Sequence, residues 1–440
     1  MTDSAALSGD FARSDTVAEH LVTADGEPLK AALAKAEYQS KKRAFLLVLP
    51  LLAFVLLTFV VPIGQMLVRS VHNDAFYSWT DRDAGVEIST MENIRAWFKA
   101  NPAGTAPNEE AYVALAADLV QAREVKAIGQ IATRINYEAP GSRSLFTKSA
   151  RRAARMEAPF SEAFMDVDED WADPGLWRAM RDASKTVTLN FYLAALDRER
   201  ADDGSIVKTN ENRAVYILLF ERTLLLSLLI TALTLILGYP IAFLLATLPL
   251  RISNLLMIMV LLPFWTSLLV RTTSWIVLLQ SQGVINDVAV GAGLLADEGR
   301  IQLIYNQTGT IIAMTHILLP FTILPLYSVM RPIDPSYVRA ARSLGATSWT
   351  AFRRIYLPQT VPGIGAGALL VFILAVGYYI TPALVGGSDG QLISNLIAFH
   401  MQKSLNWSLA AALAALLLFG ILLLYWLYDR LVGIDNLKLG

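Results

Sequence analysis

Residues 332–364 read PIDPSYVRAARSLGATSWTAFRRIYLPQTVPGI. The first half predicts a helix that begins at Asp334 and Pro335, because aspartate is a favoured N-cap and proline suits the first helical position. The helix is predicted to run through Leu344 and to end at Gly345, since glycine readily takes the left-handed conformation that closes a helix. The stretch therefore opens with one short and sharply bounded helix.

The second half predicts another short helix, which begins near residues 347–348 and is stopped by Pro358. Arginines rim both helices, and Ala340 and Ala341 leave a shallow surface that can fit into a groove on another protein. One alternative is a basic membrane-surface segment that only sets topology. A DNA-binding helix-turn-helix is a second alternative, because that motif also joins two helices by a turn with glycine. It is disfavoured because both ends of the stretch lead into apolar segments.

Six apolar stretches are long enough to cross a membrane as helices, which needs about 20 apolar residues each. They are residues 44–68, 223–248, 254–279, 309–330, 364–385 and 408–431. Hydrophobic residues make up 54% of the 440-residue chain, and only 17% are charged, against about 25% in soluble domains. The sequence therefore predicts an all-α membrane protein with six transmembrane helices, for which lipid is a direct partner.

The basic residues of the short loops predict the orientation of these helices, because they favour the cytoplasmic side. The basic residues in question are Lys41, Lys42, Arg43, Arg251, Arg331, Arg339, Arg342, Arg353 and Arg354. The opposite short loops carry the carboxylates of Asp287, Asp297, Glu298 and Asp389. Both termini are therefore predicted to be cytoplasmic, and the first span is interpreted as an uncleaved anchor.

These spans divide the chain into membrane-embedded parts and parts that face water. The predicted parts are a cytoplasmic tail 1–43, a first span 44–68, an extracytoplasmic insertion 69–216, a membrane core 217–433 that includes the cytoplasmic loop 331–361, and a cytoplasmic tail 434–440. The insertion is predicted to be a compact, mainly helical domain. An amphipathic helix is expected from Asn108 onward, and Trp171 and Trp177 are expected in a small core.

The sequence lacks the patterns that enzymes of the common classes carry. There is no P-loop, no G-x-S-x-G elbow and no cysteine, and the histidines share no metal-ligand spacing. The acidic run 166–173 begins like a calcium loop but has Trp171 in place of the required glycine and Trp177 in place of the glutamate. His316 lies inside the fourth span, where it can form a hydrogen bond to a neighbouring helix or serve a proton relay. We therefore expect a protein that is not an enzyme and holds no metal or cofactor.

The loop resembles a known family. Its pattern is similar to the signature loop of ABC importer permeases, in which glutamate-alanine-alanine, three residues, glycine and nine residues precede isoleucine, any residue, leucine and proline. The matching positions are Ala340, Ala341, Gly345, Ile355, Leu357 and Pro358. The family glutamate is Arg339 here, which reverses one charge and weakens the case for a salt bridge to an ATPase from that site. The stretches RTLLLSLLITALTLILGYPIAFLLA, LLPFWTSLLVRTTSWIVLL and GVIND look like the spermidine/putrescine-type branch, from about Phe220 to the C-terminus.

The resemblance implies the type I importer fold, in which five core helices line half of a translocation path and the first helix embraces a partner permease. It also implies a bacterial inner-membrane machine with a second permease subunit, cytoplasmic ABC ATPase subunits and an extracytoplasmic solute-binding protein, and no nucleic acid. The coupling-loop residues that it implies are Asp334, Arg339, Ala340, Ala341, Gly345, Ile355, Leu357 and Pro358. Polyamines as the transported solute rest on this resemblance alone.

A charged side chain in the third predicted span marks a candidate solute path. Arg271 near mid-membrane costs about 2.5–3.5 kcal/mol on insertion scales, so it is expected to face the bundle interior or water. Pairing with a carbonyl and a role in the path are equally open. The candidate path residues are Trp265, Thr266, Ser267, Arg271, Trp275, Tyr378, Tyr379 and Thr381. The aromatic members can contact a cation or simply anchor and pack the helices.

Two alternatives from other classes predict features that the sequence lacks. A secondary transporter driven by an ion gradient predicts paired intramembrane carboxylates and repeated half-sequences. A membrane-anchored sensor predicts a cytoplasmic signalling domain, whereas this chain offers short cytoplasmic tails. The ABC permease is therefore the interpretation that the loop and the spans favour.

Overall fold

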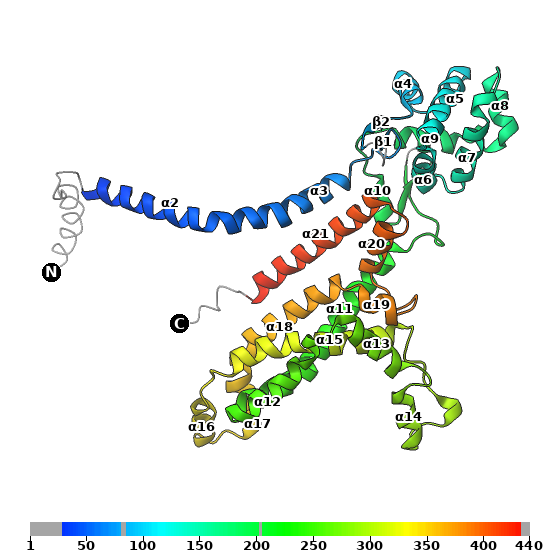
Figure 1. The fold of residues 1–440 in the computed structure, drawn as a ribbon. Coiled ribbons are helices and arrows are strands. Elements are labelled where there is room, and N and C mark those ends of the chain that lie inside the picture. Colours follow the sequence, from blue (N-terminus) through cyan, green and yellow to red (C-terminus); the bar gives the residue numbers. More distant parts are fainter. Residues whose placement is uncertain (1–28, 81–84, 202–204, 433–440) are drawn as a thin grey trace, which may run out of the picture. The chain divides into compact units, whose positions relative to one another are not determined.

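The computed structural model describes residues 29–80, 85–201 and 205–432, which form two compact units, 1–66 and 67–440 (Figure 1). The predicted tail 434–440 and residues 1–28 of the predicted N-terminal tail lie outside the described residues. In the first unit, α2 (Leu29–Val55), the π-helical turn η1 (Leu56–Val60) and the start of α3 (Val61–Arg69) follow one another without a break. The apolar side chains of Leu33–Arg69 are exposed along this helix, which is long enough to cross a membrane.

The described residues between α3 and Tyr216, which the sequence analysis assigns to the insertion, are mainly helical. Its helices are α4 (Glu92–Ala100), α5 (Glu109–Glu124), α6 (Ile128–Glu138), α7 (Ser142–Arg152), α8 (Phe160–Val167), α9 (Pro174–Ala183) and α10 (Asn190–Ala195), with the 3-10 turns η2 (Ala153–Arg155) and η3 (Glu169–Ala172). Two antiparallel hairpins pair β1 (Ser78–Thr80) with β2 (Glu87–Ser89) and β3 (Arg198–Arg200) with β4 (Ile206–Lys208).

One apolar core runs through the insertion from Phe76 to Ala183. Trp171 is fully buried, and the Trp177 ring packs against it at 6.2 Å between centroids, which confirms that these two residues belong to a core. The predicted cap of α5 is also confirmed, because the Asn108 side chain accepts a hydrogen bond from the Ala111 N–H. The backbones of residues 71–73 and 186–188 hydrogen-bond to each other, so the two ends of the segment between them lie side by side.

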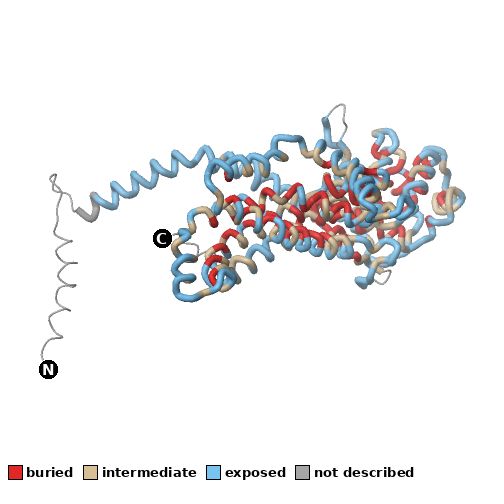
Figure 2. The backbone as a smooth tube through the Cα atoms, turned by 90° about the horizontal axis from the view of Figure 1, so that it is seen from below, coloured by how far each residue is buried: buried red, intermediate tan, exposed pale blue. Residues whose placement is uncertain are grey.

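The membrane core contains the remaining helices. They are α11 (Tyr216–Thr247), α12 (Leu250–Leu261), α13 (Leu268–Leu279), α14 (Val284–Gly291), α15 (Gln307–Met330), α16 (Ser336–Ser343), α17 (Ser348–Ala351), α18 (Leu357–Gly377), α19 (Ile380–Val385), α20 (Ile393–Gln402) and α21 (Trp407–Val432), with the turns η4 (Leu262–Trp265), η5 (Asp297–Gly299) and η6 (Phe352–Tyr356). Figure 2 shows buried residues along the inner faces of this unit.

Helices α11, α15 and α18 form the centre of the core. Leu226 of α11, Leu318 of α15 and Val371 of α18 belong to one buried cluster. Glycine allows close approach between these helices, since a Cβ at Gly238 of α11 would lie 3.2 Å from the Thr322 side chain of α15. The three helices are therefore packed as one block.

Five helices of the described chain are long and apolar enough to cross a membrane, and a sixth crossing results if one bent pair counts as a span. That pair corrects the predicted third span 254–279, because α12–η4 and α13 meet at an angle of 96°. Pro263 has no N–H to extend the helix, Thr266 and Ser267 are extended, and the Ser267 hydroxyl caps α13. The predicted fifth span 364–385 is also interrupted, since α18 ends at Gly377 and α19 begins at Ile380.

Candidate coupling loop and membrane path

The first helix of the loop, α16, begins one residue later than predicted. Pro335 occupies the N-cap position, and the Asp334 carboxylate accepts a hydrogen bond from the Ser336 N–H at 2.8 Å. This backbone hydrogen bond holds the pKa of Asp334 below its usual value. The carboxylate thus still fixes the start of the helix, by bending the chain into it rather than by occupying the cap position itself.

Gly345 ends α16 in the left-handed conformation that its sequence predicts, with φ of +89°. Its N–H donates to the Arg342 carbonyl, and the next N–H, of Ala346, donates to the Ala341 carbonyl. Apart from Gly345 and its two chain neighbours, no atom of the described residues lies within 4 Å of the position that a Cβ would occupy there. The requirement for glycine here is therefore one of backbone conformation and not of space.

The surface of α16 is open to a partner. None of its residues is buried, and Arg339 and Ala340 are exposed while Ala341 is half-buried. Leu344 at its end is 89% exposed, and Trp349 in the next helix is 68% exposed. Apolar side chains with this exposure on a polar loop are typical of a protein–protein contact.

The second helix of the loop does not stop at Pro358, and this prediction is wrong. It begins as expected, with the Thr347 hydroxyl accepting from the Thr350 N–H, but it then passes through the π-helical turn η6 into α18. In this turn the Leu357 N–H donates to the Phe352 carbonyl, five residues back, and the wider register accommodates the proline ring directly after it. Ile355 is exposed in the turn, and Leu357 is half-buried at the start of α18.

A group of aromatic rings that the sequence analysis missed joins the loop to α11. Phe352 stacks between Trp349 and Tyr356, with ring centroids 5.8 and 6.0 Å away. Its ring also meets Tyr239 and Phe243 of α11 edge-on, at 6.2 and 6.1 Å. We call these five residues the aromatic ladder. Their spacings along the two helices, three, four and four residues, are the only sequence signal for them.

Further contacts strengthen the same connection. Phe243 and Tyr356 meet edge-on at 5.3 Å, and the hydroxyls of Tyr239 and Thr360 lie 3.1 Å apart. At the other end of the loop, Arg331 donates to the carbonyls of Ala246 and Leu248, at 2.6 and 3.1 Å. A cation suits the C-terminal end of a helix, where carbonyls have no partners within the helix. Both ends of the loop therefore contact α11.

Four of the predicted path residues lie close together in the structure. The hydroxyls of Thr272 and Thr381 lie 3.2 Å apart, and this contact joins α13 to α19. Trp275 donates its indole N–H to His316 Nδ1 of α15 at 3.2 Å, as expected for a histidine that bonds a neighbouring helix. Arg271 lies one helical turn before Trp275 on α13, so the two share a face of that helix, and Tyr378 lies between the end of α18 and the start of α19. Arg271, Trp275, Tyr378 and Thr381 thus surround the junction of α13, α15 and α19.

The other predicted path residues have local roles at helix ends. The Thr266 hydroxyl donates to the Pro263 carbonyl and Ser267 caps α13, so both hydroxyls serve the bend, while Trp265 beside them is 75% exposed. The Tyr379 carbonyl accepts from the Asn395 side chain, and its ring is partly exposed. Ser267 meets Arg271 only along the helix backbone, where its carbonyl accepts from the Arg271 N–H at 3.1 Å. Within the described residues, no side-chain hydrogen bond joins these four residues to the Arg271 group.

The guanidinium of Arg271 has no hydrogen bond or ion pair with any residue of the described ranges, and its Nε is buried. The structure therefore gives no carbonyl partner to this side chain, one of the two roles that the sequence left open. The residue as a whole is half-buried, so part of the side chain stays accessible at the surface of this chain.

Comparison with known proteins identifies the core. Residues 221–433 match the family model described as "Binding-protein-dependent transport system inner membrane component". The chain is 36% identical over 243 residues to the spermidine/putrescine transport system permease protein PotB of Escherichia coli K12, covering 53% of this chain and 88% of that protein. PotB of Salmonella typhimurium SL1344 is equally similar, with 84% of its length covered.

One further relative and one solved structure are less similar to the chain. The inner membrane ABC transporter permease protein YdcU of Escherichia coli K12 is 31% identical over 226 residues, which cover 49% of this chain and 72% of YdcU. A chain of the bacterial alginate ABC transporter in complex with its alginate-bound periplasmic protein is 20% identical, with a TM-score of 0.40 over 50% of this chain and 80% of that one. From the family model, the relatives and the signature loop together, the chain belongs to the binding-protein-dependent transport system inner membrane components, as a multi-pass permease component of an ABC transporter.

Proposed function

We propose that this chain is the permease subunit of an ATP-driven importer for polyamines such as spermidine and putrescine, or for a related small organic solute. The observation that supports the solute class is the 36% identity to permeases named for spermidine and putrescine transport. The family is non-catalytic, so ATP hydrolysis takes place in a separate ATPase subunit.

The coupling loop is the part of the chain that receives the work of the ATPase. Helix α16 and its exposed end at Leu344 dock in a groove of the ATPase, and Gly345 fixes the direction in which the chain leaves that groove. Movement of the docked helix reaches α11 through the aromatic ladder and Arg331. Such coupling requires a rigid connection between loop and bundle, and stacked rings with two helix-end hydrogen bonds provide one.

The remaining partners are a second permease subunit and an extracytoplasmic solute-binding protein. Both termini lie in the cytoplasm and the insertion 69–216 lies outside, an orientation that the arginines of the loop 331–361 support. A reporter fused at residue 150 should report the outside and one at the C-terminus the inside. A cytoplasmic signal at residue 150 would reverse the whole assignment.

The solute path is lined by the Arg271 group together with surfaces of the second permease. The aromatic rings of Trp275 and Tyr378 can contact a cationic solute, whereas Arg271 repels one. A polyamine path therefore needs carboxylates from the second permease opposite this group. Selectivity for the solute lies mainly in the solute-binding protein.

Uptake of labelled spermidine and putrescine tests the proposal. Cells that produce the chain together with its ATPase, second permease and solute-binding protein should accumulate the label, and cells with Gly345→Asp in the chain should not. Accumulation that persists without the ATPase would support an ion-gradient mechanism instead. Absence of polyamine uptake, combined with ATP-dependent uptake of another solute, would overturn the solute class alone.

A further inference from the structure

The insertion supplies the cap of α11, although that helix begins the membrane core. Asp197, in the turn after α10, is 8% exposed. Its Oδ1 accepts hydrogen bonds from the N–H groups of Val215 and Tyr216, both at 3.1 Å, and its Oδ2 accepts from Ile217 at 2.7 Å. The first N–H groups of a helix have no partners within it, and a carboxylate there also complements the helix dipole. A side chain from outside the matched family segment 221–433 thus holds the start of α11.

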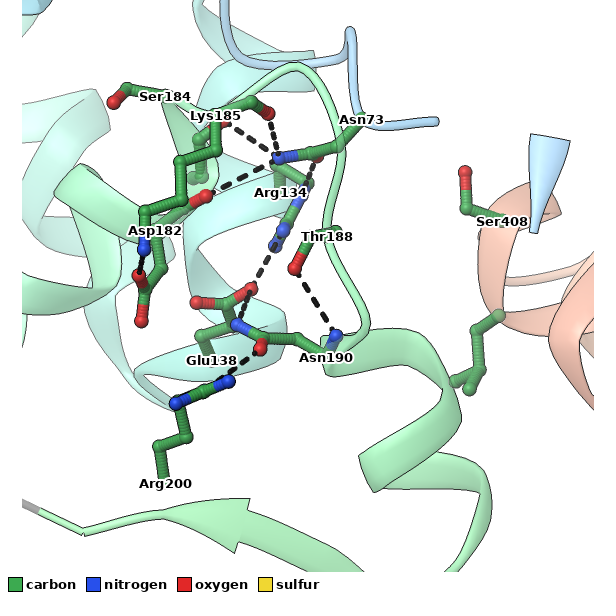
Figure 3. Close-up of polar contacts among 12 residues, drawn as sticks. Asn73, Arg134, Glu138, Asp182, Ser184, Lys185, Thr188, Asn190, Arg200 and Ser408 are labelled. Atoms are coloured by element: carbon green, nitrogen blue, oxygen red, sulfur yellow. Dashed lines mark hydrogen bonds and ion pairs between the residues drawn. The ribbon is translucent and has the colours of Figure 1, made fainter. Parts of the chain in front are cut away.

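The turn that carries Asp197 is fixed to the core of the insertion. Arg134 of α6 is 3% exposed and donates to Asn73 at 2.7 Å and to Glu138 at 2.6 Å. Asn190, the first residue of α10, donates to Glu138 at 3.3 Å and accepts from Arg200 of β3 at 3.3 Å. Figure 3 shows these residues joined in one chain of polar contacts. Because α10 and β3 flank Asp197, the carboxylate cannot move without the insertion.

Other contacts join the base of the insertion to the neighbouring core helices. The Tyr137 hydroxyl donates to the Ser404 carbonyl at 2.7 Å, between α20 and α21. Phe191 and Ala195 of α10 share a buried cluster with Leu409 and Leu413 of α21. The base of the insertion therefore contacts α11, α21 and the turn before α21 directly.

The C-terminal end of α11, opposite the Asp197 contact, is the end that the coupling loop contacts. Its 32 residues correspond to a length of about 48 Å. Pro240 interrupts the hydrogen bonds of this helix, and the ladder residues Tyr239 and Phe243 lie on either side of it. Packing against α15 and α18 supports the rest of the helix. A movement imposed at the loop can therefore reach the far end of α11 with little loss.

We infer that the insertion is a moving part of the transport cycle, fastened by Asp197 to α11 so that it follows the ATP-driven movement of that helix. This inference rests on the proposed function, because it takes the loop as the input from the ATPase. Asp197 is a positioning residue, since it contacts neither solute nor nucleotide but decides whether the insertion and α11 move together. The alternative is an insertion that stays still while the core moves beneath it.

Spin-label distances in the assembled transporter test this. The chain has no cysteine, so pairs of labels can be placed at will. One pair joins Val113 of α5 to Leu225 of α11, and a second pair joins Leu225 to Val288 of α14; all three side chains are exposed. Distances are measured without nucleotide and after trapping with ADP and vanadate. In the otherwise unchanged chain, the Leu225–Val288 distance should shift by several ångströms, while the Val113–Leu225 distance stays constant and narrow.

Asp197→Ala should uncouple the movement of the insertion from that of α11. The Leu225–Val288 shift should persist, and the Val113–Leu225 distribution should broaden or change with nucleotide. Asp197→Asn, which keeps an acceptor oxygen, should show a smaller effect and serves if the alanine variant does not fold. Glu199→Ala is the matched control, because this nearby carboxylate is more exposed and makes only a 3.7 Å ion pair to Arg213.

The outcomes distinguish the inference about the insertion from the proposed transport function. A Val113–Leu225 distance that changes with nucleotide in the unsubstituted transporter would overturn the inference and leave the proposed function intact. An Asp197→Ala variant that is less heat-stable but keeps a constant Val113–Leu225 distance would also overturn it, since the carboxylate would then be structural only. No nucleotide effect on the Leu225–Val288 pair would contradict the proposed function, and the inference with it.

Discussion

Replacement of Gly345 by alanine isolates the role of a single backbone conformation in coupling. The φ of +89° carries a penalty of roughly 1 kcal/mol for a residue with a Cβ. Since no atom lies within 4 Å of the new Cβ, no clash adds to it. In the undocked variant the loop relaxes to another conformation, and docking to the ATPase must restore the strained left-handed one. A cost of about 1 kcal/mol should therefore weaken the affinity for the ATPase by up to about fivefold.

The structure offers matched controls for this experiment. Gly293, in the loop after α14, has φ of +72° and equally open space around it. Gly293→Ala therefore carries the same backbone penalty but lies far from the coupling loop in the sequence. Gly345→Asn should bind better than Gly345→Ala, because asparagine tolerates the left-handed region. Gly345→Asp should be worst, since its bulk and charge also disturb the seating of the exposed Ala340 and the half-buried Ala341.

The affinity is measured by titration of the purified ATPase onto permease in lipid nanodiscs, with solute-stimulated ATP hydrolysis as a second readout. The expected order of affinity is unsubstituted chain, Gly345→Asn, Gly345→Ala and Gly345→Asp, with Gly293→Ala at the value of the unsubstituted chain. Equal affinities for the unsubstituted chain and Gly345→Asp would refute the reasoning. An equal loss in Gly293→Ala would show that a general loss of stability, and not the loop, explains the effect.

Three further predictions concern the aromatic ladder, the core of the insertion and His400. Phe352→Ala removes the centre of the aromatic ladder, so it should leave the ATPase bound but reduce solute-stimulated ATP hydrolysis at least several-fold. Phe352→Leu should retain part of this stimulation. Unchanged stimulation in the alanine variant would exclude the ladder as the connection between loop and bundle. A fragment of residues 69–190 should unfold cooperatively on heating, and Trp171→Ala should lower its unfolding free energy by about 3–5 kcal/mol, so a fragment without a transition would contradict a self-contained core. Burial lowers the pKa of His400, which lies outside the predicted spans, to about 4. The unfolded chain then binds the extra proton below pH 6.5, stability should fall between pH 6.5 and 4 by at most about 3 kcal/mol, and His400→Gln should flatten this dependence of melting temperature on pH.

Local signals in the sequence were sufficient where one residue type has one physical use. Asn108 caps α5, and Gly345 takes the left-handed conformation, because few residues satisfy free helix N–H groups or a positive φ at low cost. The long apolar runs at 309–330 and 408–431 became α15 and α21 with nearly the predicted bounds. The insertion core at Trp171 and Trp177 follows from the same logic, since two large apolar rings in a charged segment have to be buried together.

Proline signals were less reliable, because their effect depends on the neighbouring turn. Pro358 was expected to stop a helix, but the π-helical turn before it allows the helix to continue. In the predicted third span, Pro263 does break the helix, because two extended residues follow and a serine starts the next one. Proline removes one donor in both places, and only the surrounding backbone determines whether the chain bends or continues.

The sequence by itself determined that this is a multi-pass helical membrane protein with an ABC-permease coupling loop, because hydropathy, capping residues and motif spacing are local properties. The tertiary structure decided which distant residues meet. It placed Phe352 on Tyr239 and Phe243, joined Trp275 to His316, and set Asp197 on the first N–H groups of α11. Contacts between residues far apart in the chain depend on how helices pack, and no short-range pattern encodes that packing.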